Sequence, residues 1–382
     1  MKTLQLEWTR KGFSQDPGPD FAREWDSTNT LVLVFFSPEL VDSALWTELA
    51  RLLPNSCRTG CTGAGEVAAD RLEDHKAIIT LCRFKTGTIK LLTQTIDKIG
   101  DSFNCGQKLA KAFPRNDLSG LYIISEGLLV NGTELIAGVY AGLPDHVPVA
   151  GGLAGDGSNF KATYVLGPNG PTSGLVAGVA FYGKSLTFTC AAEGGWIPFG
   201  PPRKITRSVA NVLYEIDGKP ALQLYREYLG KQAENLPASG LLFPIQLETQ
   251  GQANCELVRT LLAIDETEQS MTFAGDMPQG SSARLMQVGI NNLIQAAKTV
   301  AEQCAAHTPK ETPVLSLVVS CVGRRLVMGE KTEDELEMIA GLLPRSSIQT
   351  GFYSYGEIAP GRRGLSELHN QTITLTWITE KE

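Results

Sequence analysis

The hydrophobic pattern of the chain begins with a strand, a helix and a glycine-rich loop. Residues 30–36 (TLVLVFF) form a short, continuously apolar run, which is typical of a strand buried on both faces. The SPE sequence at 37–39 follows, with Ser at the N-cap, Pro at the first helical position and an acid in the first turn. It predicts a helix, which ends at the Leu-Pro pair 53–54. The next strand runs into a loop that closes on Gly65 and Glu66.

Two further copies of this unit follow along the chain. The second copy has a strand at 120–125, a helix capped by Asn131, a Leu-Pro stop and a loop that closes on the Gly-Asp pair 155–156. The third copy has a strand at 314–321, a helix capped by Thr332, the same stop and a Gly-Glu closure. Agreement in both order and spacing indicates an internal repeat.

The repeat predicts a layered α/β fold. One unit cannot bury its own strands, so the units must pack helix on sheet or sheet on sheet. A β-rich stretch from about 185 to 280 separates the second copy from the third, and a length of 382 residues suits two domains. We therefore expect two α/β halves with a β-rich middle, which enclose a cleft and place the three Gly-acid loops at corresponding positions.

Composition and charge restrict the classes of function. Apolar residues make up 42% of the chain and charged residues 20%, which predicts a folded protein throughout. The net charge is -7 and Lys and Arg form no run longer than two, so nucleic acid is not an expected partner. The sequence lacks a signal peptide and any run of about 18 apolar residues, so we expect a cytoplasmic protein without membrane insertion. Its eight cysteines are then reduced core residues.

The common sequence signatures of catalysis are absent. The chain has no Walker motif, GxSxG elbow, HExxH or CxxC, so an enzyme is not the leading interpretation. The acids of the three loops, Glu66, Asp156 and Glu357, could hold the amine of a ligand or accept backbone N–H groups of their own turns. We favour the structural role.

Aromatic residues and histidines provide further candidates. Tyr353 and Tyr355 alternate along an apparent strand and are expected to face one way, where they either line a pocket or pack within the sheet. Among four histidines, His369 is the strongest candidate for a ligand, because it starts a strand near the Tyr-Gly-Glu loop. A structural role for this histidine is the alternative.

Several motifs resemble one known family in their order along the chain. GFYSYGEI at 351–358 and ELHNQTITLT at 367–376, with SCVGRR upstream, resemble the C-terminal FIST domain. GCTGAGEV at 60–67 and PVAGGLAGDGSNF at 148–160 resemble its N-terminal partner domain. The resemblance covers nearly the whole chain from about residue 30. It implies an N-terminal strand and linker at 1–29, a FIST N-terminal domain at 30–215 and a FIST C-terminal domain at 216–382.

The resemblance implies a sensory, non-catalytic module of bacterial signal transduction that binds a small ligand. It implies as partner a separate histidine kinase or cyclic-di-GMP enzyme. Some stand-alone relatives are haem-binding nitric oxide sensors, which implies haem b as a cofactor, with His369 as the first choice of iron ligand and His146 as the second. An amino acid bound without haem is the alternative.

The sequence therefore gives one set of candidate ligand-binding residues and two competing functions. The candidates are Tyr353, Tyr355, Gly356, Glu357, His369, Asn370, Gly65, Glu66, Gly155 and Asp156. The first competing function is a hydrolase or lyase that uses Cys61 or Cys321 as a nucleophile near a glycine-rich loop. The second is a scaffold whose glycines serve turns alone.

Overall fold

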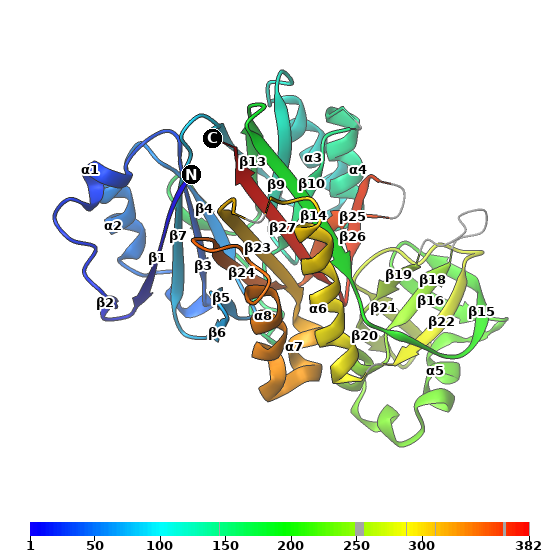
Figure 1. Cartoon of the computed structure of the whole chain (residues 1–382). Coiled ribbons are helices and arrows are strands. Elements are labelled where there is room, and N and C mark those ends of the chain that lie inside the picture. Colours follow the sequence, from blue (N-terminus) through cyan, green and yellow to red (C-terminus); the bar gives the residue numbers. More distant parts are fainter. Residues whose placement is uncertain (145, 249–255, 288, 310, 362–363, 382) are drawn as a thin grey trace.

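The computed structural model describes residues 1–144, 146–248, 256–287, 289–309, 311–361 and 364–381. They form a core of three sheets, and a smaller second module, residues 197–287, lies beside this core (Figure 1). The chain enters the second module after strand β14 (Leu186–Glu193) and returns to the core through helix α6 (Ile290–Ala305).

Each copy of the repeat forms two parallel strands joined by a helix, since parallel neighbours need a crossover connection. These pairs are β3 (Thr30–Phe36) with β4 (Cys57–Thr62), β9 (Leu118–Ser125) with β10 (Val149–Leu153), and β23 (Val314–Cys321) with β24 (Ile348–Ser354). The first strand of each pair also has an antiparallel neighbour, which is β7 (Ala77–Arg83), β13 (Leu175–Tyr182) or β27 (Ile373–Glu380) respectively. The predicted α/β repeat is confirmed.

Each copy also contributes a strand to the sheet of another copy. From the first copy, β5 (Glu66–Ala68) pairs with β24 of the third. From the third copy, β25 (Gly356–Pro360) pairs with β10 of the second. From the second copy, β11 (Val165–Gly167) pairs with β4 of the first. The exchange is cyclic, so the three copies have an approximate threefold arrangement and no sheet is complete without a neighbouring copy.

Hairpin and outer strands complete the three sheets. Their orders are β12-β11-β4-β3-β7-β1-β2, β26-β25-β10-β9-β13-β8 and β14-β27-β23-β24-β5-β6. The added strands are β1 (Lys2–Thr9), β2 (Gly12–Phe13), β6 (Arg71–Glu73), β8 (Thr88–Thr95), β12 (Gly170–Thr172) and β26 (Ser366–His369). The N-terminal strand is thus β1, paired with β7, and the segment expected to be a linker contains helix α1 (Phe21–Trp25).

Hydrophobic side chains of the three sheets meet at the centre of the core. Alternate residues of β3 face this centre, namely Leu31, Leu33 and Phe35. The residues between them pack under the helices. Phe35 and Phe352 stack there with ring centroids 4.9 Å apart, which joins the first copy to the third. Burial of both faces explains why this strand reads as an uninterrupted apolar run.

Helices cover the outer faces of the sheets. The first sheet has α2 (Leu45–Leu52), the second has α3 (Ser102–Lys111) and α4 (Gly132–Gly142), and the third has α6, α7 (Val322–Met328) and α8 (Thr332–Ala340). The helix predicted after 37–39 is instead a short 3-10 turn at Pro38–Leu40 followed by α2. The Ser37 hydroxyl makes no cap and donates to Glu66 Oε2 at 2.7 Å.

One glycine in each copy permits a close approach of two parallel strands. A Cβ atom at any of these positions would lie 1.8 Å from a carbonyl oxygen of the neighbouring strand, which no side chain can tolerate. The three glycines, with the residues opposite, are Gly60 with Val34, Gly151 with Ile123 and Gly351 with Val318. We call them the close-approach glycines.

The register of the exchanged strands against the close-approach glycines shows which of the three loop acids occupy equivalent positions in the repeat. Glu66 and Glu357 each lie in an exchanged strand and pair one residue beyond the close-approach glycine of the neighbouring copy. The corresponding residue of the second copy is Val165. Asp156 comes earlier, at the start of a loop over 156–164 that precedes the exchanged strand. The expected equivalence of three acids therefore holds for two of them and is wrong for Asp156.

The second module has its own sheet and its own hydrophobic core, as a β-rich middle predicts. Its core is formed by residues such as Leu213, Met271 and Phe273. Its elements are β15 (Ile197–Val209), β16 (Val212–Ile216), β17 (Lys219–Pro220), α5 (Ala221–Leu229), β18 (Ile245–Glu248), β19 (Glu256–Arg259), β20 (Leu261–Asp265), β21 (Ser270–Phe273) and β22 (Ser282–Gln287). Two short 3-10 segments, Gly230–Asn235 and Ala238–Leu242, lead from α5 to β18.

Candidate functional site

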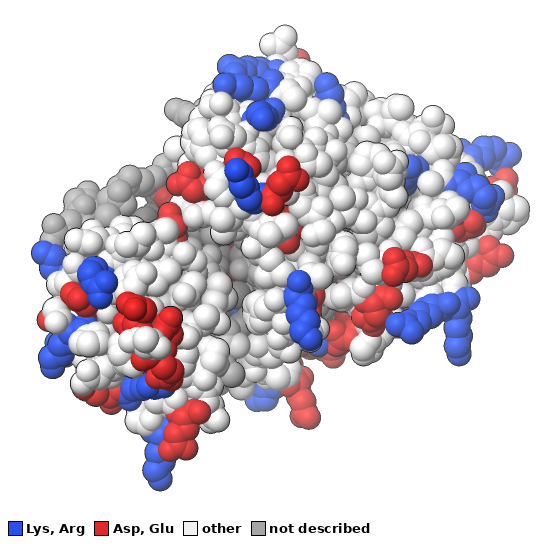
Figure 2. All heavy atoms as spheres, turned by 180° about the vertical axis from the view of Figure 1, so that it is seen from behind, with Lys and Arg blue, Asp and Glu red and all other residues white. Residues whose placement is uncertain are grey.

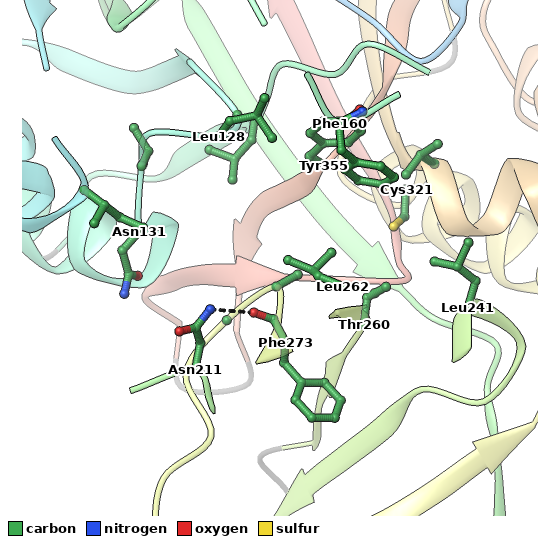
Figure 3. A pocket seen from close by; sticks show the side chains of 17 residues that line it. Leu128, Asn131, Phe160, Asn211, Leu241, Thr260, Leu262, Phe273, Cys321 and Tyr355 are labelled. Atoms are coloured by element: carbon green, nitrogen blue, oxygen red, sulfur yellow. Dashed lines mark hydrogen bonds between the residues drawn. The ribbon is translucent and has the colours of Figure 1, made fainter. Parts of the chain in front are cut away.

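A cavity of about 190 Å³ lies between the core and the second module (Figure 3). The core supplies the turn after β9, the loop 156–164, and residues at the ends of β23 and β24. The second module supplies residues from β20, β21 and the turns that flank them. The labelled lining residues are Leu128, Asn131, Phe160, Asn211, Leu241, Thr260, Leu262, Phe273, Cys321 and Tyr355. We call this space the interface cavity.

Asp156 organises the loop 156–164 that forms one wall of the interface cavity. Its carboxylate accepts backbone N–H bonds from Phe160 at 2.8 Å, Lys161 at 2.8 Å and Ala162 at 3.0 Å. The same carboxylate accepts the hydroxyl of Tyr355. Asp156 thus satisfies donors of its own loop, which is the structural role that the sequence favoured.

Phe160 and Tyr355 form the aromatic wall of the cavity. Their rings stack with centroids 4.5 Å apart and an angle of 15° between planes. Phe160 has a φ of 51°, a left-handed conformation that is uncommon for a residue with a bulky side chain. The residue remains 41% exposed. The loop therefore holds an aromatic ring at the mouth of the cavity in spite of a local conformational cost.

Three polar side chains line the interface cavity. The amide of Asn131 is engaged at both ends, because its Oδ1 caps α4 through Glu134 N at 3.1 Å and its Nδ2 donates to Asp276 at 3.2 Å. Asn211 donates to Phe273 O at 2.8 Å. The Thr260 hydroxyl is buried and, among the described residues, has no hydrogen-bond partner. Thr260 therefore offers a ligand a buried hydroxyl that is not engaged with the described residues.

Tyr353 does not share the cavity with Tyr355. It is fully buried, and its hydroxyl donates to Glu335 Oε1 at 2.7 Å. Glu335 is also paired with Arg324 at 2.7 Å, and both side chains are fully buried. Arg324 additionally donates to the carbonyl oxygens of Gly194 and Leu293. The two tyrosines therefore lie in different environments. Tyr355 lines the interface cavity, whereas Tyr353 belongs to a buried polar network of the third copy.

The two equivalent acids, Glu66 and Glu357, lie inside the core and do not line the interface cavity. Glu357 accepts Ser354 Oγ at 2.6 Å, and Thr372 N and Oγ1 at 3.1 and 2.9 Å. Burial raises its pKa to about 7, although these hydrogen bonds act in the opposite direction. Burial also raises the pKa of Glu66 well above its usual range.

The glycines predicted to bind a ligand have structural explanations. Gly65 has a φ of 122°, and a Cβ there would lie 2.4 Å from Arg325 Nη1. Gly356 packs against Leu153 and Leu368, where a side chain would collide with both. A Cβ at Gly155 would meet Ala64 N at 3.2 Å. These positions are close packing sites around the exchanged strands.

His369 lies at a second cavity of about 230 Å³, which shares no lining residue with the interface cavity. Its Nε2 is 3.1 Å from Ala359 O, which fits an N–H group donating to that carbonyl. Burial, assisted by the charge of Arg259, lowers the pKa of His369 to about 4, so the ring is neutral at pH 7. Asn370, its neighbour, is buried and contacts Tyr355 O at 3.5 Å.

The residues around His369 do not fit a haem group. A porphyrin presents two large apolar faces. This cavity has apolar residues such as Trp196 and Met286, but Glu193, Glu367 and Gln246 also line it beside His369. His146, the second choice, is exposed and lines neither cavity. Haem therefore stays a prediction of the family resemblance.

The thiols offer little support for a cysteine nucleophile. Burial raises the pKa of both Cys61 and Cys321, whereas a nucleophilic cysteine requires a lowered one.

Within the described ranges, no cluster of three or more His, Cys, Asp or Glu side chains is arranged to hold a metal ion.

The molecular surface and the helices limit other types of partner. On the face shown in Figure 2, the described Lys and Arg side chains are interspersed with Asp and Glu and form no extended basic area. This face therefore lacks the basic stripe that tracks phosphates.

In the part of the chain that the structure describes, no helix has both the length and the apolar character needed to span a membrane.

The fold and the cavity define the class of protein. It is an α/β protein with a cyclic threefold repeat and a cavity between this core and a second module. The family is shown by two models, the FIST N domain at residues 30–219 and the FIST C domain at residues 221–360. The chain belongs to the FIST family, whose domains are associated with the sensing of small ligands in signal transduction.

The chain is also similar to curated proteins of Mycobacterium tuberculosis. Two of them, from two strains, each bear the description "uncharacterized protein". Each is 28% identical over 251 residues, which is 64% of this chain and 60% of the relative. The chain thus spans less than two thirds of the length of these relatives.

Several lining residues could not be found from the sequence. Thr260 and Leu241 lie in LVRTLLAIDE and LLFPIQLE, stretches that resemble the FIST family but that gave no sign of a binding role, and Asn211 lies in neither. All three reach the site because the second module folds back onto the core. The one available signal was the sequence DGSNF at 156–160, in which an acid precedes an exposed aromatic residue by four positions.

Proposed function

We propose that this chain is a bacterial sensory protein that binds a small ligand in the interface cavity. The observation that carries the proposal is the position of this cavity, which lies where two separately packed bodies meet and has mainly apolar walls with few polar groups. A ligand held there contacts both bodies. It therefore favours one arrangement of the second module relative to the core over others.

The altered arrangement supplies the signal. Two segments both line the cavity and reach the molecular surface. In loop 156–164 the lining residue Phe160 is itself partly exposed, and in the 3-10 segment the lining residue Leu241 precedes the exposed Leu242. Ligand binding changes the surface that these segments present. Membership of the FIST family supports a signalling role, with a separate histidine kinase or cyclic-di-GMP enzyme as the regulated partner.

A binding screen with two matched variants tests the site. Amino acids, nucleosides and small neutral aromatic compounds are added in turn, and ligands are detected by a rise in the midpoint of thermal unfolding. Ala274→Trp fills the cavity and should abolish the rise. Ala263→Trp, at an exposed position on β20, should leave it unchanged. A rise that persists in Ala274→Trp would place the ligand elsewhere and refute the proposed site.

The output is tested with the ligand that the screen identifies. The chain is mixed with a purified histidine kinase or a cyclic-di-GMP cyclase from the same organism, with and without ligand. A change in phosphorylation or cyclase rate that Ala274→Trp removes is the expected result. The absorption spectrum of the purified chain tests haem independently, because bound haem gives a Soret band that nitric oxide shifts.

A further inference from the structure

The lining of the interface cavity carries no charge. None of its described residues is Lys, Arg, His, Asp or Glu. Its two weak acids, Cys321 and Tyr355, stay neutral because burial raises the pKa of each. The buried guanidinium of Arg259 packs behind the lining residue Gly275, but it donates to the carbonyl oxygens of Asp276 and Leu368 and is not itself part of the lining. An ionised ligand would therefore lose its hydration here without direct contact with a counter-charge, which is unfavourable.

Three carboxylates beside this lining accept hydrogen bonds from the walls. Asp156 accepts three backbone N–H groups and the Tyr355 hydroxyl, and Asp276 accepts the amide of Asn131. Glu126 accepts Leu128 N at 2.9 Å and the Thr163 hydroxyl at 2.6 Å. Their hydrogen bonds hold the walls in place and none of the three lines the cavity, so they offer an amine no direct contact.

The mouth of the cavity is apolar and partly exposed. Ile99, Phe160 and Leu262 line it with 54%, 41% and 41% of their surface exposed to solvent. Exposure of apolar side chains to water is unfavourable, so a group of them around a cavity is typical of a binding site whose ligand shields them from solvent. Phe160 adds a flat ring, held in place by Tyr355 and by the loop that Asp156 organises, and flat rings favour stacking partners.

We propose that the ligand is an uncharged, planar aromatic compound that covers Ile99, Phe160 and Leu262 and exchanges one hydrogen bond with the Thr260 hydroxyl. This inference rests on the proposed function and specifies its ligand class. It distinguishes the protein from an amino-acid receptor, because an amino acid carries two charges that this lining does not match.

Indole and its charged derivatives test the charge requirement. Tryptamine carries a positive charge and indole-3-acetate a negative charge at pH 7, on the same ring. Titration calorimetry should show that indole binds and that both derivatives bind at least about tenfold more weakly. Binding of indole should be lost in Ala274→Trp and kept in Ala263→Trp. Equal or tighter binding of either derivative, or no binding of indole, overturns the inference.

Thr260→Val tests the hydrogen bond, because it keeps the branched shape and removes the hydroxyl. Indole affinity should fall about three- to tenfold, the range of one hydrogen bond. Naphthalene, which has no N–H group, should bind wild type and variant alike. The unfolding midpoint of the ligand-free variant should not fall, since the hydroxyl has no partner there. Equal loss for both compounds would mean that Thr260 acts through packing and would overturn its assigned role.

The outcomes separate this inference from the proposed function. If other compounds of the screen bind and Ala274→Trp blocks them while indole fails, the site stands and the ligand class is wrong. If Ala274→Trp blocks no compound, the site itself is wrong.

Discussion

Tyr355 and Asp156 are 199 positions apart in the sequence and share a buried hydrogen bond, from the tyrosine hydroxyl to the carboxylate. Tyr355 follows β24 of the third copy, and Asp156 opens the loop 156–164 of the second. The bond therefore joins two copies at the wall of the interface cavity. Because the same carboxylate also binds Phe160 N, it fixes the aromatic stack.

Tyr355→Phe is expected to destabilise the protein while preserving the stack. The change removes a hydrogen bond to a charged group, which is worth about 1.5–3 kcal/mol. Urea unfolding measures the loss. Tyr122→Phe is the control, because the Tyr122 hydroxyl is buried and has no partner among the described residues. That control should be neutral or stabilising, and equal destabilisation by both changes would contradict the importance of the bond.

Arg324→Met is expected to cost about 3–5 kcal/mol of unfolding free energy. It leaves the fully buried carboxylate of Glu335 without its cation. The double variant Arg324→Met with Glu335→Leu should recover part of this loss, because it removes the uncompensated charge as well. Chemical denaturation of the single and double variants measures the coupling, and purely additive effects would show that the pair does not act as a unit.

Glu357 is expected to make stability depend on pH. The pKa of this buried carboxyl is about 7, against 4.5 for an ordinary glutamate, so the folded state keeps its proton over a range in which the unfolded chain has lost it. The unfolding free energy should therefore fall between about pH 4.5 and 7, by up to roughly 1.4 kcal/mol per pH unit, and change little above. Glu357→Gln should remove this component. A constant difference between wild type and variant from pH 5 to 8 would contradict it.

Gly351→Ala is expected to destabilise the third sheet by about 3 kcal/mol, at the upper end of the usual cost of overpacking. The added methyl group would lie 1.8 Å from Val318 O, so the parallel strands must move apart. Gly100→Ala is the matched control, since no atom lies within 4 Å of a Cβ at that position. Thermal unfolding compares the two, and similar midpoints would show that the strand pair adjusts freely.

Local features of the fold were predictable because they depend on neighbours in sequence. The strand at 30–36 has the predicted bounds, since burial on both faces leaves a continuous apolar pattern. Asn131 caps its helix as predicted, with Oδ1 accepting Glu134 N. Thr332 was predicted to cap but is the first helical residue, and its hydroxyl donates to Gly329 O at 2.6 Å.

Long-range features were not predictable from local pattern. The cyclic exchange of β5, β11 and β25 depends on which sheet edge each strand reaches, and three similar units differ little in this respect. The candidate site shows the same limit. Tyr355 and Asp156 were recognised separately, but their contact with each other and with residues such as Thr260 depends on how distant segments pack.

The cyclic exchange of strands also constrains how the chain can fold during synthesis. The hairpin of β5 and β6 emerges early, yet its partner β24 is made only after the second module and α6 have been completed. Until then its edge is exposed and can pair with other chains. The native partners are distant in sequence, so we expect slow final assembly. A protein cut between its two family domains would leave β5 without its edge partner, so its N-terminal part should aggregate rather than fold alone.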